Sequence, residues 1–413
     1  MNKFREMYPD LSYFFYKVFG TQPDNWTAVF KSFGLMLGFA FLACGMLLRS
    51  ELMRLEKLGY IKATTKEEKP ESMYNADFYW NLVLSIFLGA KLPLIFGDFS
   101  AFKADPASVI FSLEGNFLVG LLIGAAVFYY YYKNQPKEQN TKPILVTVHP
   151  HQRTTDIIFI AAISGVIGAR LFSILENFSD FLRDPAGQLF AGSGLTVYGG
   201  IILAFIAVYY YVNKHGIKPV YMMDIAGMGI LLGYAIGRIG CQLSGDGDWG
   251  IVAANMPDWW FLPDWLWAYD YPNNVLNEGK LLAGCNEAIY LATPGSAETR
   301  CAAACGLRYC HALEAPVYPT PVYETTISLL GFGLLFFLRN KIKTAGLLFF
   351  LYMIYNGVER FFIEGIRVNE RYDLLGMHYS QAQYISIAFV LIGFAGAVYL
   401  SIKKSPNGSQ IES

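Results

Sequence analysis

Nine long apolar stretches constrain this chain more than any other feature of its sequence. Each approaches the roughly 20 residues that a helix needs to cross a bilayer. The stretches are residues 28–48, 79–97, 107–130, 157–175, 197–213, 221–243, 325–338, 346–363 and 383–402. Only 16% of the residues are charged, against about a quarter in a typical soluble domain. The sequence therefore predicts an all-α polytopic membrane protein with about nine transmembrane helices.

Basic residues gather in alternate loops between these stretches. They lie in residues 49–66, 133–153, 214–218, 339–343 and 403–404. By the positive-inside rule, this pattern places the N-terminus outside the cell and the C-terminus in the cytoplasm. The net charge of −1 leaves no basic surface for nucleic acid. The N-terminus lacks the apolar stretch and cleavage site of a signal peptide, so we expect the first stretch to remain in the mature protein.

Part of the chain is repeated at an offset of 79 residues. The segment 89–92 (GAKL) matches 168–171 (GARL), 105–107 (DPA) matches 184–186 (DPA), and Gly115 and Gly120 match Gly194 and Gly199. We therefore expect residues 76–135 to form an extra helical hairpin duplicated from residues 155–214. A hairpin adds two crossings and so leaves the direction of every later helix unchanged. The first copy has lost polar groups, which indicates a structural role.

The longest segment outside the apolar stretches, residues 247–322, is predicted to be an enlarged periplasmic loop of a single domain that spans residues 1–413. It contains Cys285, Cys301, Cys305 and Cys310. Four cysteines in an oxidising compartment predict two disulfides. A zinc site is the alternative, but the spacing lacks a C-x-x-C pair.

The most specific motif is the run from Gly237 to Gly250, GRIGCQLSGDGDWG, which ends the sixth stretch. An arginine inside a span costs about 2.5–3.5 kcal/mol on insertion scales, so Arg238 indicates function. Asp224 opens the same predicted helix, either as a charge or cap at the membrane interface or as part of the chemistry.

A second charged group ends the eighth stretch. Arg360, Glu364 and Arg367 are spaced so that a continuous helix would place them on one face. One interpretation is an ion pair that only joins helices, and Arg367 is the most typical of a plain interfacial charge. The other interpretation is a lipid phosphate site, because guanidinium groups offer planar, permanently charged forks to phosphate oxygens.

In the predicted topology, eight polar residues in or next to the stretches lie toward the outer half of the bilayer. These are Arg170, Tyr198, Arg238, Asp246, Tyr323, Glu324, Arg360 and Glu364. All five histidines lie outside the stretches, which argues against an intramembrane metal protease.

The run from Gly237 to Gly250 resembles the signature of the prolipoprotein diacylglyceryl transferases, Gly-Arg-x-Gly-Asn-x-x-Asn-Gly-Glu followed by a glycine. Residues 168–171 are similar to the earlier arginine motif of that family, and residues 194–200 to its His-Gly-Gly motif. Residues 318–324 resemble its His-Pro-Ser-Gln-Leu-Tyr-Glu motif, and residues 360–367 its last arginine motif. Asp224 stands where the family has an aspartate. The resemblance covers the first stretch and residues 157–402, which implies a seven-helix family core plus the duplicated hairpin.

The chain departs from the family at five positions. Tyr198 stands in place of the histidine, Cys241 and Ser244 replace the two signature asparagines, Asp246 replaces the glutamate, and Phe33 replaces an early tyrosine. These departures leave the identity of the proton acceptor open, with Glu364 and Asp246 as the carboxylate candidates and Tyr198 expected mainly to orient substrate.

The resemblance implies transfer of the diacylglyceryl group of phosphatidylglycerol to the cysteine thiol of a prolipoprotein signal peptide in the bacterial inner membrane. The products are a thioether and glycerol 1-phosphate. The expected catalytic residues are Tyr198, Arg238, Asp246, Arg360 and Glu364. The expected substrate-binding residues are Arg170, Gly199, Gly200, Ser244, Tyr323 and Glu324. Membrane lipid is a further partner, and no cofactor or metal is expected. The alternatives are an inactive relative that binds lipoprotein precursors and a lipid or anion transporter.

Overall fold

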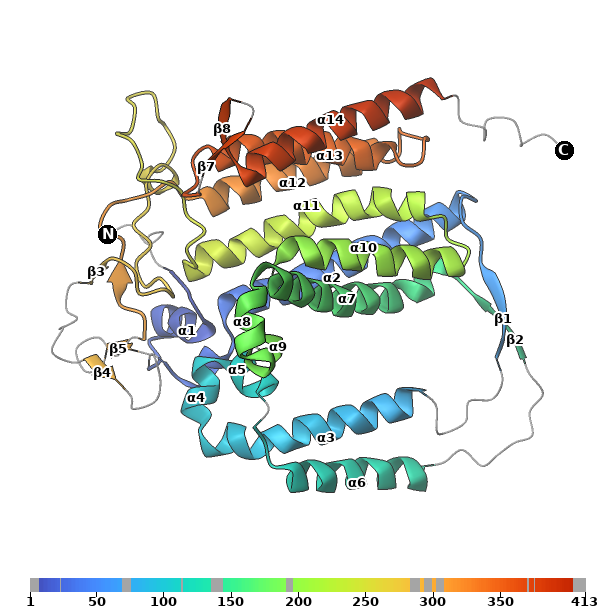
Figure 1. Cartoon of the computed structure of the whole chain (residues 1–413), viewed down its shortest axis with the longest axis horizontal. Helices are drawn as coiled ribbons and strands as arrows, with labels where there is room; N and C mark the ends of the chain where they lie inside the picture. Colours follow the sequence, from blue (N-terminus) through green and yellow to red (C-terminus); the bar gives the residue numbers. More distant parts are fainter. Residues whose placement is uncertain are drawn as a thin grey trace. The chain divides into compact units, whose positions relative to one another are not determined.

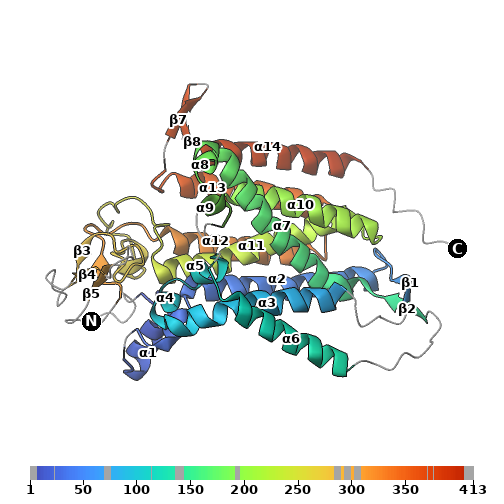
Figure 2. The same cartoon turned by 60° about the horizontal axis from the view of Figure 1, so that its bottom comes forward.

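The computed structural model describes residues 7–22, 24–68, 76–112, 114–134, 144–190, 196–282, 290–292, 299–301, 308–369, 371–374 and 376–403. The chain divides into two compact units. The first comprises Met1–Glu51 with Pro219–Ser413, and the second comprises Leu52–Lys218. Figures 1 and 2 show that long helices make up most of both units.

The first unit is built on five long helices, α2 (Ser32–Lys57), α11 (Pro219–Ser244), α12 (Thr320–Leu338), α13 (Leu347–Glu364) and α14 (Gln381–Ile402). Helix α11 packs against α12 and α13, and α13 packs along α14. Their shared core consists of Leu47, Met228, Leu231, Leu335, Leu348, Tyr352 and Met353. Because apolar side chains from α2, α11, α12 and α13 meet there, the helices hold the polar residues near their ends in register.

Asp224 supports this packing. Its carboxylate accepts hydrogen bonds from the backbone N–H groups of Gly346 at 2.7 Å and Phe349 at 2.9 Å. These groups belong to the first turn of α13, where helix N–H groups have no partner within the helix. Asp224 therefore caps α13 rather than its own helix α11. Of the two interpretations from the sequence, the cap is the one that the contacts support.

A loop region covers one end of these helices in the first unit. It comprises α1 (Leu11–Phe19), η1 (Trp26–Val29), η3 (Asp264–Leu266) and three short two-stranded sheets. These pair β3 (Lys280–Leu281) with β6 (His311–Ala312), β4 (Tyr290–Ala292) with β5 (Thr299–Cys301), and β7 (Arg371–Leu374) with β8 (Met377–Ser380). A second core of Met7, Trp249, Tyr269, Tyr271, Leu313 and Val317 holds the N-terminal segment against residues 249–317. The long loop is thus folded onto the helix ends.

The described cysteines include both bonded and free thiol groups. Cys310 is disulfide-bonded, whereas Cys44 and Cys241 are free thiols. Cys285 and Cys305 lie outside the described residues, and Cys301 is described only as the last residue of β5. A disulfide at Cys310 removes one sulfur from the alternative zinc site.

The second unit contains two helical hairpins with the same order of elements. One consists of α3 (Ala76–Gly97), α4 (Phe99–Ala104), α5 (Pro106–Phe111) and α6 (Phe117–Lys133). The other consists of α7 (Thr154–Glu176), α8 (Phe178–Arg183), α9 (Pro185–Phe190) and α10 (Val197–Lys214). Strand β1 (Thr64–Glu68) precedes the first hairpin, and β2 (Ile144–Val148) and η2 (Pro150–Arg153) connect the two hairpins. The two strands form an antiparallel ribbon, paired from Thr64↔Val148 to Glu68↔Ile144.

The predicted stretch 107–130 is wrong as a single helix. Helix α5 ends at Phe111 and α6 begins at Phe117. The buried Lys91 on α3 donates to the carbonyl oxygens of Ser112 and Glu114, both at 2.5 Å. These hydrogen bonds satisfy backbone groups that the break leaves without helical partners. Lys91, the counterpart of Arg170 in the repeat, therefore has a local structural function.

The prediction of a repeat without gaps is also wrong, because the second half of the repeat is shifted by one residue. A Cβ on Gly120 would lie 2.5 Å from the carbonyl oxygen of Ile86, and a Cβ on Gly200 would lie 2.9 Å from that of Gly165. Ile86 and Gly165 are 79 positions apart, but Gly120 and Gly200 are 80 apart. Because the connection before α10 is one residue longer, the packing counterpart of Gly120 is Gly200 rather than Gly199.

Six helices in the described part of the chain are long and apolar enough to cross a membrane. They are Ser32–Lys57, Phe78–Gly97, Pro150–Glu176, Pro219–Ser244, Thr320–Leu338 and Gln381–Ile402, with Phe117–Lys133 as a shorter apolar helix. The chain is therefore a mostly helical, polytopic membrane protein. The number of nine crossings stays a prediction.

Gly199 offers a test of the helix packing in the second unit. A Cβ at this position would lie 2.4 Å from both the carbonyl oxygen of Gly168 and the Cβ of Phe172. We expect Gly199→Ala to destabilise the protein by about 1–3 kcal/mol, because overpacking forces the two helices apart. The measurement is thermal unfolding of the purified protein in detergent.

The matched control is Gly165→Ala on α7, where the nearest atom to a new Cβ is 3.9 Å away. This variant should melt at or slightly above the wild-type temperature, since alanine favours helix. Equal melting temperatures for the two variants would contradict the close approach of α7 and α10.

Candidate active site

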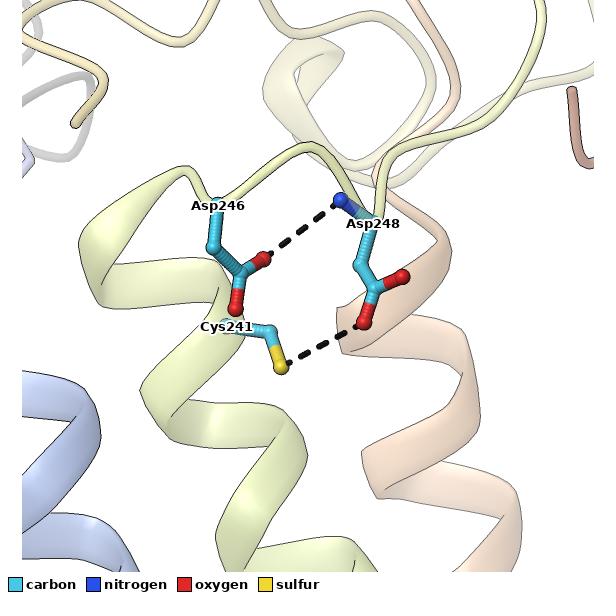
Figure 3. A group of neighbouring side chains, drawn as sticks. All are labelled: Cys241, Asp246 and Asp248. Carbon is cyan, nitrogen blue, oxygen red and sulfur yellow. Dashed lines mark hydrogen bonds between the residues drawn. The ribbon is translucent and has the colours of Figure 1, made fainter. Parts of the chain in front are cut away.

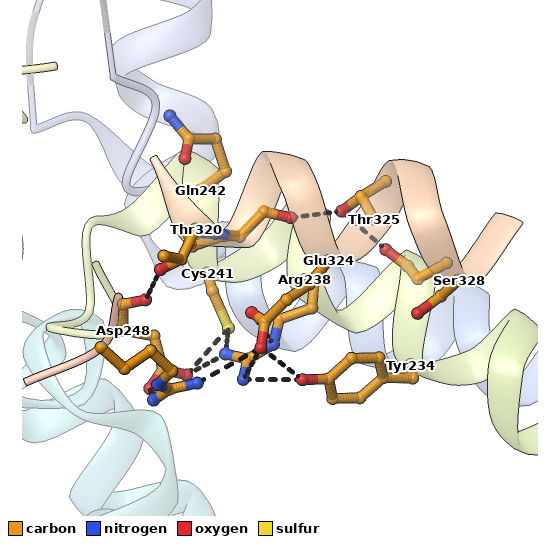
Figure 4. Close-up of polar contacts among 12 residues, drawn as sticks. Tyr234, Arg238, Cys241, Gln242, Asp248, Thr320, Glu324, Thr325 and Ser328 are labelled. Carbon is orange, nitrogen blue, oxygen red and sulfur yellow. Dashed lines mark hydrogen bonds and ion pairs between the residues drawn. The ribbon is translucent and has the colours of Figure 1, made fainter. Parts of the chain in front are cut away.

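Polar side chains from three helices of the first unit meet where α11 ends. Helix α11 contributes Tyr234, Arg238 and Cys241, whose spacing places them on one helical face. Helix α12 contributes Glu324, and α13 contributes Arg360 and Glu364. The turn after α13 contributes Arg367, and the loop after α11 contributes Asp246 and Asp248. Figure 4 shows Tyr234, Arg238, Asp248 and Glu324 converging.

The carboxylate of Glu324 is the centre of this cluster and has no exposed side-chain surface. Its Oε2 atom lies 2.8 Å from Nε of Arg238. Its Oε1 atom lies 3.1 Å from Nη1 of Arg360 and 3.4 Å from Nη1 of Arg367. The hydroxyl of Tyr234 donates to the same Oε1 at 2.7 Å. One buried anion thus joins three guanidinium groups from separate segments.

Tyr234 links the arginines a second time. Its hydroxyl oxygen accepts from Nη2 of Arg238 at 3.0 Å and from Nη1 of Arg360 at 3.2 Å. The guanidinium carbon of Arg238 also lies 4.9 Å from the centre of the Tyr234 ring, within the range of a cation–π contact. Tyr234 therefore fixes the orientation of the two arginines of the family motifs.

Asp248 bridges two arginines from the solvent side. Its Oδ1 lies 2.6 Å from Nη2 of Arg367, and its Oδ2 is ion-paired with Nη1 of Arg238. Its side chain is 35% exposed. Burial opposes the charge of this carboxylate, but the guanidinium groups of Arg238 and Arg367 outweigh it and lower the pKa of Asp248. Asp248 is consequently ionised at neutral pH.

Asp246 has a different environment, although it is only two residues away. Its carboxylate, the Asp248 carboxylate and the Cys241 sulfur lie within 4.8 Å of one another (Figure 3). Burial raises the pKa of Asp246, and the neighbouring charge of Asp248 raises it further. A carboxylate with a raised pKa is a stronger base than free aspartate. Asp246 is therefore suited to accept a proton from a thiol.

Glu364 is paired with Arg360 at 3.4 Å, as the ion-pair interpretation predicts. Its carboxylate also accepts from the hydroxyl of Ser380 at 3.0 Å and from the side-chain amide of Asn369, and only 1% of its side chain is exposed. These contacts occupy both oxygens. A carboxylate held in this way is poorly placed to receive a proton from a substrate.

The remaining predicted residues of this unit make structural hydrogen bonds. The hydroxyl of Tyr323 donates to the carbonyl oxygen of Leu266 at 2.5 Å, which ties the long loop to α12. The hydroxyl of the buried Ser244 donates to the carbonyl oxygen of Gly240 at 2.8 Å. In this structure both hydroxyls are used within the protein.

Four predicted residues lie in the second unit and are described within that unit. Tyr198 is 47% exposed in the first turn of α10. Gly199 and Gly200 allow the close approach to α7, and a Cβ on Gly200 would lie 3.4 Å from the Cβ of Ala169. Arg170 is half-buried on α7. The contacts of the two glycines show packing between helices.

Sequence reasoning missed Tyr234 and Asp248 and underestimated Arg367. Helix α13 ends at Glu364, so the predicted shared helical face of Arg360, Glu364 and Arg367 is wrong at its last member. Arg367 instead reaches Glu324 and Asp248 from the following turn, which pairs with Gly250 in a β-bridge. The spacing of Tyr234 and Arg238, one helical turn apart, is the signal that could have identified Tyr234.

Cys241, Asp246 and Asp248 form the group of donors, within the described ranges, that a metal ion could use. Both oxygens of Asp248 already face guanidinium groups, whose positive charge opposes binding of a cation. This electrostatic environment is unfavourable for a cation at these donors.

Comparison with known proteins gives a consistent result. The family model described as prolipoprotein diacylglyceryl transferase matches residues 116–399. The match begins next to α6 and so includes the second helix of the hairpin that the sequence resemblance had left outside the family. It does not extend to α2, which the resemblance had included.

Several curated relatives carry the name phosphatidylglycerol–prolipoprotein diacylglyceryl transferase. That of Staphylococcus carnosus is 27% identical over 252 residues, which cover 61% of this chain and 76% of the relative. That of Lysinibacillus sphaericus is 26% identical, with 62% of this chain and 80% of the relative covered. That of Staphylococcus aureus strain Newman is 27% identical, with 63% and 79% covered. The family match spans more than half of the sequence, and the chain belongs to the prolipoprotein diacylglyceryl transferase family.

Proposed function

We propose that this chain transfers the diacylglyceryl group of phosphatidylglycerol to the thiol of the lipobox cysteine in prolipoproteins. The observation that carries the proposal is the convergence of Arg238, Arg360 and Arg367 around Glu324 and Asp248. Such preorganised cations suit the phosphate of the lipid and stabilise the charge that develops on the leaving group. The family membership and the names of the relatives support the same reaction.

The proposed reaction is a single displacement at carbon. The cysteine sulfur attacks the C3 carbon of the diacylglycerol, and the bond between that carbon and the phosphate oxygen breaks. The leaving oxygen keeps the electron pair, so glycerol 1-phosphate departs as an anion while a thioether forms. Asp246 accepts the thiol proton because burial raises its pKa, whereas the oxygens of Glu364 are held by Arg360, Ser380 and Asn369. Arg238 and Arg360 hold the phosphate.

The substrates would reach this site from within the membrane. We propose nine crossings, with the N-terminus in the periplasm and the C-terminus in the cytoplasm, in the bacterial inner membrane. This topology places the arginines toward the outer leaflet, where signal-peptide cysteines would meet phosphatidylglycerol. Tyr198 and Arg170 are proposed to orient substrate, and the disulfide at Cys310 to brace the outer loop.

A mass-shift assay tests the reaction itself. Purified protein is incubated with a lipobox peptide and phosphatidylglycerol, and the peptide mass is measured. A gain of one diacylglyceryl group on cysteine supports the proposal. An unmodified peptide in the presence of folded protein would favour the inactive binder or the transporter.

We expect Arg238→Ala and Arg360→Ala, tested separately, each to lower kcat/KM. The loss of a charge-assisted contact to phosphate is worth about 1.5–3 kcal/mol, or roughly 10- to 150-fold. The control is Arg339→Ala, which breaks a comparable pair with the buried Glu51, 2.6 Å away, outside the cluster. That variant should lose stability but keep its turnover per folded molecule. Turnover within a few-fold of wild type in either test variant would disprove the phosphate site.

Asp246→Asn should lower kcat/KM by about 10²- to 10⁴-fold, the usual worth of a general base. In the wild-type protein, kcat/KM should fall as the pH drops through the pKa of Asp246, because the protonated carboxyl cannot accept the thiol proton. Since burial raises this pKa, the acid limb should lie above the range of free aspartate. Loss of that limb in Glu364→Gln, with Asp246→Asn retaining it, would transfer the role to Glu364.

Tyr198→Phe removes only a hydroxyl. We expect kcat/KM to fall about 2- to 10-fold, the worth of one neutral hydrogen bond to substrate. A neutral phenol is a poor base at neutral pH, so the reaction should survive. Normal turnover would indicate a packing role instead. Complete loss, with rescue by Tyr198→His, would show that this position accepts the proton.

A further inference from the structure

The three arginines of the cluster at the end of α11 are already balanced by three ion-paired carboxylates before any substrate enters it. The ion pairs described above join the cations Arg238, Arg360 and Arg367 to the anions Glu324, Glu364 and Asp248. A phosphodiester would bring one more negative charge into this poorly solvated region. An uncompensated buried charge costs several kcal/mol. Phosphate binding therefore requires that one of the three carboxylates leave its partners.

Two of the three carboxylates are held too firmly to leave. Glu324 and Glu364 lie on helices, and 0% and 1% of their side chains are exposed. Each also accepts a hydrogen bond from a hydroxyl group, that of Tyr234 at 2.7 Å and that of Ser380 at 3.0 Å respectively. Withdrawal of either would break this hydrogen bond as well as its ion pairs, and the buried carboxylate has almost no surface through which to reach water.

Asp248 differs from the other two in each of these respects. It lies in a loop, next to Gly247 with a φ of +95°, and 35% of its side chain is exposed. Besides its contacts with the two arginines, the Asp248 carboxylate makes a weak contact with the Cys241 sulfur, at 3.7 Å. Its backbone is anchored separately, since the hydroxyl of Thr320 donates to its carbonyl oxygen at 2.7 Å. The side chain can therefore rotate toward water without unfolding the loop.

The geometry of Asp248 also imitates the expected ligand. Its two oxygens contact Nη1 of Arg238 and Nη2 of Arg367, so one carboxylate spans two guanidinium groups. Figure 4 shows Asp248 beside Arg238. The two non-bridging oxygens of a phosphodiester have the same charge and offer the same pair of acceptors. The two anions would compete for the same guanidinium hydrogens.

We propose that Asp248 is a built-in counterion that occupies the phosphate site of the empty enzyme and that the phosphate of phosphatidylglycerol displaces. This proposal rests on the function proposed above, and it adds Arg367 to the residues that contact the lipid phosphate. The displaced carboxylate enters water, and the phosphate takes its place as the third negative charge beside the three arginines. Arginines that would otherwise repel one another are thus kept together between turnovers.

The competing explanation is that Asp248 only positions the arginines. The two explanations predict opposite effects of Asp248→Asn, which removes the charge and keeps the size of the side chain. If Asp248 competes, its removal tightens lipid binding. If Asp248 only positions Arg238 and Arg367, its removal weakens binding.

The experiment is a calorimetric titration of the purified protein in detergent with dihexanoyl phosphatidylglycerol, without peptide. We expect Asp248→Asn to lower Kd about 10-fold, which corresponds to about 1.4 kcal/mol. Asp248→Glu keeps a competing carboxylate and should stay within about 3-fold of wild type. An unchanged or higher Kd in Asp248→Asn would overturn the proposal. A melting curve of each variant confirms that the protein titrated is folded.

Two controls separate the local effect from general charge effects. Asp258→Asn makes the same change in net charge at an exposed position of the outer loop and should leave Kd unchanged. Glu324→Gln removes a carboxylate from the same arginines at a buried position and should weaken binding, because Glu324 is not displaced. If Asp258→Asn tightened lipid binding as much as Asp248→Asn, the effect would come from the net charge of the protein, and the proposal would be overturned.

The titration is independent of turnover. If the mass-shift assay gives no product but Asp248→Asn binds phosphatidylglycerol more tightly, the proposed counterion role is supported and the proposed transferase activity is disproved. If product forms but the Kd of Asp248→Asn does not fall, the transferase activity is supported and the counterion role is disproved.

Discussion

The buried carboxylate of Glu324 is the interaction on which the rest of the cluster depends. It has no contact with solvent and compensates guanidinium groups from α11, from α13 and from the turn that follows α13. Removing one partner of a buried ion pair typically costs 3–5 kcal/mol, because the other charge remains in a region of low dielectric. Three arginines would also repel one another without this anion. Glu324 therefore determines how closely the ends of three helices approach.

The loop after α11 adds two carboxylates with opposite properties. Gly245 and Gly247 have φ values of +61° and +95°, which allow the chain to turn sharply where the helix ends. The turn places Asp246 and Asp248 side by side, yet only Asp248 faces the arginines with both oxygens. Its pKa is lowered, whereas burial raises that of Asp246. Neighbouring carboxylates whose pKa values diverge are typical of sites that separate charge stabilisation from proton transfer.

Much of the fold could be predicted from the sequence, but its local details could not. Apolar length predicts the long helices well, because a helix across a bilayer must satisfy its backbone internally. The break between α5 and α6 was missed, since its carbonyl oxygens are satisfied by Lys91, some 20 residues away in the chain. The one-residue shift in the repeat was missed because it depends on which glycine contacts Gly165.

The sequence by itself determined the membrane character of this chain, its family and the arginines at positions 238 and 360, because hydropathy and short motifs are local properties. Only the tertiary structure decided which charges neutralise one another. Arg367 and Asp248 come from segments 119 residues apart and pair only because a turn and a loop meet at the start of α12, where Thr320 contacts Asp248. Electrostatic energy depends on distance and burial in space, and neither can be read from the order of residues along the chain.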